Sequence, residues 1–291
     1  MSHTPLLKAQ SISKTFQYQK NLGMFKRETK TVHSLVEFSL EINEPSIVGL
    51  VGPNGAGKTT FIKHCLGLVE KTSGWIEVLG FDPYTGQPIS DENKAKYPNQ
   101  DNWLGRLNRA FGGTYNKAPF LKQVGLVSGQ KQTLDANLSA QESLRLSGYL
   151  YDMDTDEIET RIEYLVNRFD IKHKIDVPVR QLSLGQRMKF EIISSILHSP
   201  KFLFMDEPTL GLDFEAQTMM REMLLELHKE QGLTILLTSH YLPDITTLCS
   251  RVAVIEKGAK VFDGKVSELM TKVNRSGYLK TLVEELNKQT N

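Results

Sequence analysis

Hydrophobic and polar residues follow two different periods along the chain. Short apolar runs over residues 47–51 and 201–205 are closed by turn residues or by acids, which predicts buried strands. Longer stretches over 139–170, 186–198 and 216–230 place apolar residues at helical spacing among charged ones. Because strands alternate with helices, the pattern predicts an α/β core with a largely parallel sheet.

Further elements are expected on both sides of these. Short apolar or alternating runs predict strands over residues 6–12, 32–42, 73–80, 123–127, 233–238, 251–256 and 260–263. Charged residues at helical spacing predict a C-terminal helix over 266–287. A polar segment with several Lys and Arg, residues 17–30, separates the first two strands and is expected to be a hairpin tip or a loop.

The middle helices follow one another without a strand between them. They predict a helical subdomain over about residues 135–195, inserted into a core that spans 1–265, with 266–291 as a helical extension. A polar, turn-rich stretch over 84–121 reads as a second insertion. Within it, residues 101–112 have the pattern of a short amphipathic helix, which either docks a partner or the membrane surface or packs as an elaborated loop.

Composition and charge restrict the function classes. The chain has 35 Lys and Arg against 34 Asp and Glu, so no overall field favours nucleic acid or anionic lipid. Cys65 and Cys249 match no metal-ligand spacing and are expected to be reduced, buried thiols. The first residues do not have the pattern of a secretory signal, and no window approaches the ~18 apolar residues of a membrane-spanning helix. Any action on a membrane is therefore expected from outside the bilayer.

The strongest chemical signal is a glycine-rich turn between a predicted strand and a predicted helix. Residues 52–59 read Gly-Pro-Asn-Gly-Ala-Gly-Lys-Thr, a complete G-x-x-x-x-G-K-[ST] pattern. Glycines let successive N–H groups and the positive end of the following helix face phosphate oxygens. We expect Lys58 to reach the β- and γ-phosphates of a nucleotide and the Thr59 hydroxyl to coordinate Mg²⁺.

A pair of acids follows the apolar run over 202–205. Asp206 ends this predicted strand, and the carboxyl ends of parallel strands are where such sheets bind ligands. Asp206 suits the Mg²⁺ shell, and Glu207 can act on the water that attacks the γ-phosphate, as general base or orienting group. Two acids that merely cap a strand before Pro208 are the alternative, which the phosphate-binding turn upstream makes less favourable.

A third motif narrows the class of nucleotidase. The run from Leu182 to Gln186, Leu-Ser-Leu-Gly-Gln, resembles the LSGGQ signature of ATP-binding-cassette (ABC) ATPases, with Leu184 in place of the commoner glycine. It lies between the phosphate-binding turn and the acidic strand, as in that family. The segment 211–213 is similar to the family's D-loop, and the segment 238–240 is similar to its switch histidine segment.

This resemblance implies a fold and a set of site residues. The fold is an α/β P-loop core with a mostly parallel sheet, an antiparallel β subdomain and an inserted helical subdomain. Implied catalytic residues are Lys58, Gln130, Glu207 and His240, with Gln132 as an alternative to Gln130. Implied metal ligands are Thr59, Gln130 and Asp206. Implied nucleotide contacts are Phe16, with Tyr18 as its rival for adenine, and Gly52, Pro53, Asn54, Gly55, Ala56, Gly57, Lys58, Thr59, Thr60, Ser183, Gly185, Gln186 and Asp213.

The resemblance also implies partners and a mechanism. Two copies would pair head to tail, so that Ser183 and Gly185 of one copy complete the ATP and Mg²⁺ site of the other. Residues 181–217 and 238–258 resemble the corresponding runs of exporter subunits of the drug or polysaccharide type. This resemblance implies separate transmembrane permease subunits. It also implies a peripheral location on the cytoplasmic face of the membrane, and no nucleic acid partner.

A soluble ABC ATPase that acts on DNA or ribosomes is the alternative. DNA-repair or chromosome-organising members would separate the phosphate-binding turn from the signature by long coiled-coil arms. Here about 125 residues lie between Lys58 and Ser183, and a single set of motifs is present, whereas ribosome-acting members normally carry two. The transporter interpretation is therefore preferred.

Overall fold

The computed structural model describes residues 5–23, 26–90, 118–129, 132–271, 280–282 and 284. The chain divides into two compact units. The first unit comprises residues 1–44, 50–117 and 251–291, and the second unit comprises residues 45–49 and 118–250. The predicted amphipathic helix over 101–112 and the predicted glutamine Gln130 lie outside the described residues.

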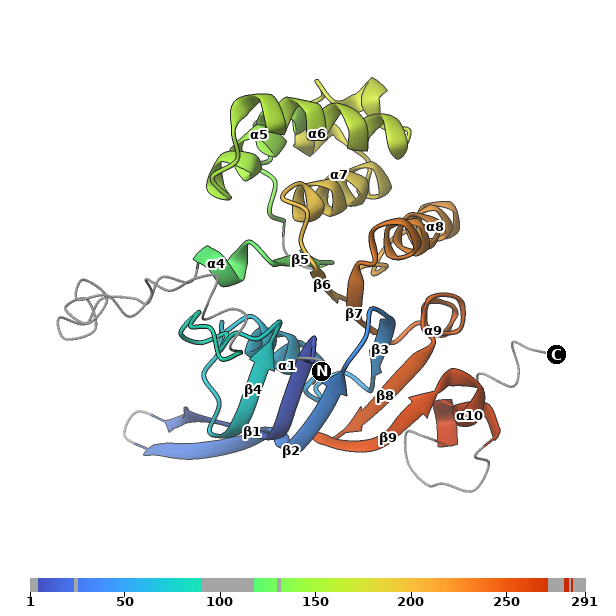
Figure 1. Cartoon of the computed structure of the whole chain (residues 1–291). Coiled ribbons are helices and arrows are strands. Elements are labelled where there is room, and N and C mark those ends of the chain that lie inside the picture. Colours follow the sequence, from blue (N-terminus) through green and yellow to red (C-terminus); the bar gives the residue numbers. More distant parts are fainter. Residues whose placement is uncertain are drawn as a thin grey trace. The chain divides into compact units, whose positions relative to one another are not determined.

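An antiparallel sheet forms one part of the first unit. Its strand order is β2-β1-β4, from β1 (Leu7–Gly23), β2 (Lys26–Ile42) and β4 (Ser73–Val78). Leu7, Ile12 and Ile76 of these strands are buried. Phe38 is also buried and packs against Phe61 of α1 (Lys58–Cys65), with ring centroids 4.6 Å apart. The sheet therefore supports the helix that follows the glycine-rich turn (Figure 1).

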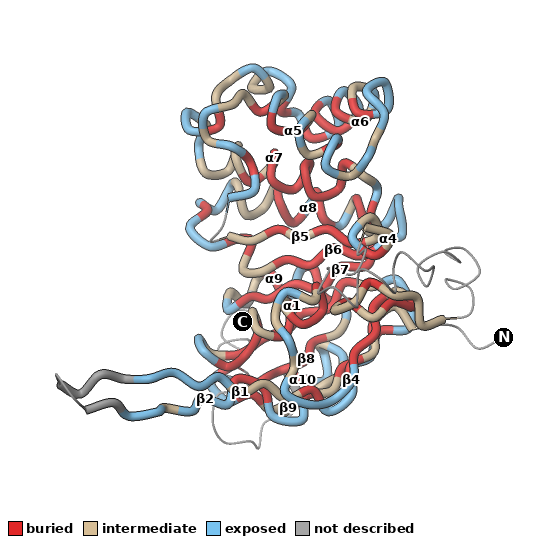
Figure 2. Tube along the Cα trace, turned by 90° about the vertical axis from the view of Figure 1, so that its left-hand side faces the viewer, coloured by how far each residue is buried: buried red, intermediate tan, exposed pale blue. Residues whose placement is uncertain are grey.

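The first two strands continue past the third one as a two-stranded ribbon. The β1–β4 pairing stops at Ser13 and Ser73, whereas the β1–β2 pairing runs on to Gly23 and Lys26. Figure 2 shows this ribbon as a long, mostly exposed arm. Of the two alternatives for residues 17–30, the hairpin is correct, and strands occupy all of the segment's described residues. Because the ribbon buries neither face fully, its sequence lacks the apolar alternation that predicts strands.

A second antiparallel pair completes the first unit. Strands β8 (Arg251–Glu256) and β9 (Ala259–Lys265) pair with each other, and the short helix α10 (Val266–Thr271) contacts β9. The turn between the strands contacts the glycine-rich segment, because the N–H of Gly258 donates to the carbonyl of Ala56 at 3.0 Å. The helix predicted over 266–287 is described only in part.

Three parallel strands form the centre of the second unit. They are β5 (Val124–Ser128), β6 (Phe202–Asp206) and β7 (Thr234–Ser239), in that order, with Ser128 beside Asp206 and Asp206 beside Thr238. Strand β3 (Ile47–Val51) follows β7 in the order and is entirely buried. Its first three residues belong to the second unit and its last two to the first. The parallel strands and their burial confirm the α/β interpretation.

Helices make up the rest of the second unit. The longer ones are α5 (Ala140–Leu150), α6 (Thr155–Arg168), α7 (Leu184–Ile196) and α8 (Phe214–Gln231). The shorter ones are α4 (Ala118–Leu121), η2 (Lys172–Lys174), η3 (Val179–Gln181) and α9 (Leu242–Leu248). Helices α5, α6 and α7 pack on one another, and α7 also contacts β5 (Figure 1). Among the residues that the structure describes, none of the helices combines the length and apolar character needed to cross a bilayer.

Candidate active site

The glycine-rich turn leads from β3 into α1 in the first unit. Gly55 and Gly57 have φ angles of 78° and 112°, a region that glycine enters without steric cost. A Cβ atom on Gly52 would lie 2.2 Å from the carbonyl oxygen of Ile255, so only glycine fits there. Gly57 is also the N-cap residue of α1 and offers no side chain to the helix's first N–H groups. Those donors are suited to an anion.

Lys58 is the first residue of α1, and its ammonium group stays at the turn. Only 4% of the residue is exposed, and Nζ donates to the carbonyls of Gly52 at 2.7 Å and Pro53 at 3.3 Å. Thr59 and Thr60 follow in the same helical turn, and Oγ1 of Thr60 accepts a hydrogen bond from Ser34 at 2.8 Å. The turn thus brings together the Lys58 ammonium group, the N-terminus of α1 and backbone N–H groups that glycine leaves uncovered. These groups fit a bound phosphate chain.

The two predicted acids lie at the end of β6 in the second unit. Glu207 has a φ angle of 52°, which is uncommon for a residue with a side chain. Its N–H lies 3.1 Å from the carbonyl oxygen of Thr238 and 3.0 Å from Oγ1 of the same residue. The Thr238 hydroxyl in turn donates to Oδ1 of Asp206 at 2.8 Å. One threonine side chain therefore fixes the backbone of one acid and the carboxylate of the other.

His240 lies against Glu207. Its Nδ1 is 2.9 Å from Oε2 of Glu207, and the side chain of Glu207 is only 12% exposed whereas that of His240 is 47% exposed. The predicted catalytic pair is thus brought together, with the carboxylate shielded and the imidazole open to solvent. A carboxylate next to a hydrogen-bonding imidazole is an arrangement that can orient a water molecule and stabilise charge on an adjacent phosphate.

The signature residues begin helix α7. Ser183 is the N-cap in a capping box, in which its Oγ accepts from the N–H of Gln186 at 3.2 Å and its own N–H donates to Oε1 of Gln186 at 3.1 Å. Because Oγ acts here as an acceptor, its O–H can still donate to a ligand. A Cβ on Gly185 would lie 2.8 Å from Cβ of Ala216, so this glycine also permits close packing on α8.

The D-loop residues lead into helix α8. Asp213 is the N-cap residue, and its Oδ1 accepts from the N–H of Ala216 at 2.8 Å. The unusual Leu184 of the signature lies near this loop, because a Cβ on Gly211 would be 3.3 Å from its Cδ2 atom. Phe214, the first residue of α8, is 75% exposed. The signature and the D-loop therefore pack against each other in the second unit.

The remaining predicted residues are less constrained. Phe16 and Tyr18 lie two residues apart on β1, so they are on the same face of the ribbon, and both are exposed. The Lys14 ammonium lies 4.9 Å from the centre of the Phe16 ring. Gln130 lies outside the described residues, and its alternative Gln132 is exposed.

Both cysteines are buried and neither forms a disulfide, as expected. Burial raises the pKa of the Cys65 thiol well above its usual value. Burial, and secondarily the negative charge of Asp244, also raises the pKa of Cys249. Neither thiol is therefore a nucleophile at neutral pH.

Comparison with known proteins decides the family. A family model described as ABC transporter matches residues 35–210, more than half of the chain. The chain belongs to the ABC transporter family. It is a nucleotide-binding ABC subunit that hydrolyses ATP, and its α/β P-loop architecture is that of ABC ATPase cassettes.

Individual ABC relatives agree. The ABC transporter ATP-binding protein NatA of Bacillus subtilis (strain 168) is 31% identical over 245 residues, which cover 84% of this chain and 87% of NatA. The Nod factor export ATP-binding protein I of Sinorhizobium fredii (strain NBRC 101917 / NGR234) is 33% identical over 234 residues, covering 80% of this chain and 59% of that protein. A solved dimeric ATP-binding cassette in a post-hydrolysis state with ADP and Pi shares the fold, with a TM-score of 0.66 at 20% identity, over 89% of this chain and 98% of that one.

The ABC motifs did not point to every polar residue that surrounds the site. Arg221 of α8 and Asp244 of α9 form a buried ion pair beside the D-loop and the switch segment, with Nη1 2.9 Å from Oδ1. Arg221 lies in a stretch that the sequence predicts as an amphipathic helix, whereas the sequence predicts no element around Asp244. Only their burial distinguishes them from surface charges.

Proposed function

We propose that this ABC ATPase drives an exporter, as a homodimer bound to a permease made by a separate chain. The single observation that carries the ATPase mechanism is the contact between Glu207 and His240 beside Asp206. An ABC module that only senses nucleotide would not need this pair. The direction of transport is supported by relatives named for Nod factor export, and the dimer by a similar cassette solved as a dimer.

We assign the roles of the residues as follows. Lys58 and the N–H groups of the turn hold the phosphates of the substrate ATP, and Glu207 takes or orients the proton of the attacking water. His240, which lies next to Glu207, stabilises the negative charge of the γ-phosphate. Phe16 or Tyr18 stacks on adenine, and Gln130 contributes to the metal shell.

Mg²⁺ would be held by Thr59 and Asp206, whose hydroxyl and carboxylate oxygens are the hard ligands it prefers. When bound, it would neutralise part of the negative charge of the phosphates.

The proposed dimer gives the signature and the D-loop a role in the site. Ser183, whose hydroxyl proton is not used in its capping box, would donate to the γ-phosphate held by the second copy. Asp213 and the exposed Phe214 would lie in the same interface. One copy alone would then bind ATP but hydrolyse it slowly, because the donors around the triphosphate are incomplete.

Substituting Glu207 tests the mechanism. Glu207→Gln keeps the size and hydrogen-bonding capacity of the side chain but removes the base, so we expect turnover to fall by about 100-fold or more while ATP binding persists. Phosphate release and equilibrium binding of Mg-ATP measure the two quantities. Wild-type turnover in Glu207→Gln would refute the assignment.

Affinity capture tests the transporter assignment. A tagged copy of the chain is captured from source membranes that have been solubilised in detergent. It should co-purify with an integral membrane protein. Recovery with ribosomes or DNA and without any membrane protein would favour the alternative class of soluble ABC ATPase.

A further inference from the structure

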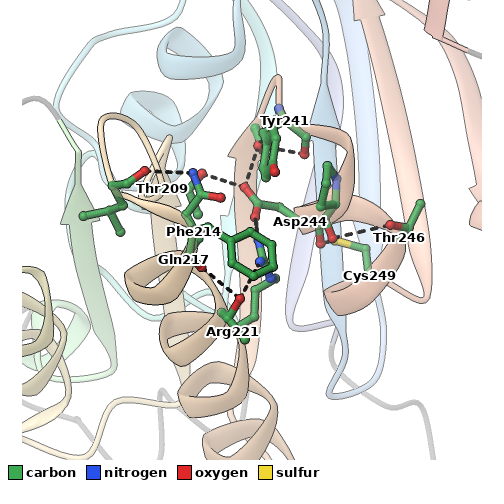
Figure 3. A network of polar contacts seen from close by, with 12 residues as sticks. Thr209, Phe214, Gln217, Arg221, Tyr241, Asp244, Thr246 and Cys249 are labelled. Carbon is green, nitrogen blue, oxygen red and sulfur yellow. Dashed lines mark hydrogen bonds and ion pairs between the residues drawn. The ribbon is translucent and has the colours of Figure 1, made fainter. Parts of the chain in front are cut away.

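A buried polar network joins three segments that surround the catalytic pair. Asp244 of α9 lies at its centre and is entirely buried, and Arg221 of α8 is 6% exposed. Figure 3 shows Asp244 between Arg221 and the loop that carries Thr209. A buried carboxylate is costly unless every lone pair is used, so the contacts of Asp244 define what it does.

Both oxygens of the Asp244 carboxylate are occupied. Oδ1 accepts from Nη1 of Arg221 at 2.9 Å. Oδ2 accepts from the hydroxyl of Thr209 at 2.6 Å and from that of Ser239 at 2.9 Å. Three donors from three different segments therefore converge on one side chain.

Two of these segments carry the proposed catalytic residues. Thr209 lies two residues after Glu207, and the N–H of Leu210 donates back to the carbonyl of Glu207 at 3.2 Å. Ser239 directly precedes His240. Its Oγ accepts a hydrogen bond from the N–H of Tyr241 at 2.9 Å, so this bond links the two neighbours of the histidine. A shift of Asp244 would therefore move the backbone on both sides of the Glu207–His240 contact.

Arg221 extends the network to the dimer-facing helix. Its Nη2 donates to Oγ1 of Thr218 at 3.2 Å, one turn after the first residues of α8. Helix α8 begins at the D-loop residue Asp213, which we assign to the interface with the second copy. The network thus joins the segment that faces the γ-phosphate to the helix that begins at the interface.

We propose that Asp244 is a positioning residue for ATP hydrolysis, which holds the His240 segment, the loop after Glu207 and helix α8 as one body. The proposal rests on the function proposed above, because that function assigns Glu207 and His240 their roles. Asp244 touches neither substrate nor metal in this assignment. It acts by fixing the geometry in which the carboxylate and the imidazole meet.

The test separates turnover from binding in two variants. Asp244→Asn removes the central charge, and Thr209→Val removes one link without altering any charge, so the second variant decides if the first does not fold. For both, we expect kcat per nucleotide-binding chain to fall by about 10- to 100-fold, since small displacements of catalytic groups have effects of this size. The Kd for Mg-ATP should stay within about threefold of wild type, because the phosphate-binding turn is unchanged.

Asp263→Asn is the matched control. Asp263 also pairs with an arginine, with Nε of Arg251 2.7 Å from Oδ1, but it lies on β9 in the first unit. It should lower the melting temperature and leave kcat per nucleotide-binding chain unchanged. A purely structural role for Asp244 would give the same result as this control.

The outcomes discriminate clearly. Loss of kcat in a folded Thr209→Val variant, with ATP binding retained, supports the positioning role. Wild-type kcat per binding chain in either folded variant overturns it. Glu207→Gln is measured in parallel: if Glu207→Gln is inactive and Thr209→Val is fully active, only the positioning role fails, whereas an active Glu207→Gln removes the proposed function itself.

Discussion

At the scale of single residues, the site depends on one threonine more than its motifs suggest. Thr238 accepts from the N–H of Glu207 at 3.0 Å and donates to Asp206 at 2.8 Å. It is fully buried at the end of β7, so water cannot replace its hydroxyl in either bond. The hydroxyl therefore holds the two acids in fixed positions relative to each other.

Replacing this hydroxyl should damage catalysis more than stability. Thr238→Val keeps the branched shape but removes both hydrogen bonds, and we expect kcat to fall by about 10- to 100-fold with ATP binding largely retained. Thr234→Val, four residues earlier on the same buried strand, is the control and should hydrolyse ATP normally. Equal activity of the two variants would show that the Thr238 hydroxyl does not position the acids.

At the scale of elements, two helices of the second unit start in the same way. Ser139 caps α5 and Ser183 caps α7, each in a complete capping box. The distance from the serine Oγ to the N–H of the residue three positions later is 3.2 Å in both. The bonds from the serine to the helix backbone are therefore matched, although the Ser139 hydroxyl also donates to Oε2 of Glu142 at 2.8 Å. Only Ser183 belongs to the signature. Comparing substitutions at Ser139 and Ser183 therefore separates the loss of a helix cap from the loss of a proposed contact with the nucleotide.

Alanine substitution at the two caps should give similar stability and different activity. Ser139→Ala and Ser183→Ala should each lower the free energy of unfolding by ~1 kcal/mol, the usual value of a serine cap. Only Ser183→Ala should reduce steady-state ATP hydrolysis, because only its hydroxyl is assigned to the nucleotide of the second copy. Chemical denaturation and phosphate release measure the two effects. Equal hydrolysis by both variants would contradict the role of Ser183 in the shared site.

At the scale of the whole molecule, the proposed homodimer requires a surface that one copy leaves uncovered. Phe214 is 75% exposed at the start of α8, and Leu210 of the preceding loop is 39% exposed. Both residues flank the D-loop aspartate Asp213. Large apolar side chains that are exposed beside a functional loop are typical of an interface.

Removing the Phe214 ring should weaken ATP-dependent dimerisation. In a Glu207→Gln background, where bound ATP is retained, Phe214→Ser should shift the chain from dimer to monomer in sedimentation velocity with Mg-ATP. Leu150→Ser is the control, because Leu150 is 76% exposed at the end of α5 and belongs to neither the signature nor the D-loop. A dimer that persists in Phe214→Ser as it does in Leu150→Ser would exclude this residue from the interface.

Much of this molecule can be predicted from its sequence where one local rule dominates. The buried strand over 47–51 is observed with the same limits, and the strand before Asp206 is displaced by one residue. The glycine-rich turn needs glycine for steric reasons that the motif already encodes. In such places local chemistry and global fold agree.

The rest of the structure depends on contacts that no local sequence pattern predicts. The ribbon of β1 and β2 is stabilised by backbone pairing in a polar segment, so no apolar period marks it. Arg221 and Asp244 lie 23 positions apart, and their pairing follows only from how α8 and α9 pack. Charged residues on helices usually face solvent, and nothing in the order of residues marks these two as buried.

The left-handed backbone at Glu207 has a consequence for laboratory evolution. Glycine adopts this conformation without steric penalty, whereas glutamate adopts it at a cost. Selecting variants for heat resistance alone would therefore enrich glycine at this position. The selected proteins would be more stable but would not hydrolyse ATP. Any selection for a more stable form of this ATPase must therefore measure turnover in every round, since this stabilising change would remove the proposed general base.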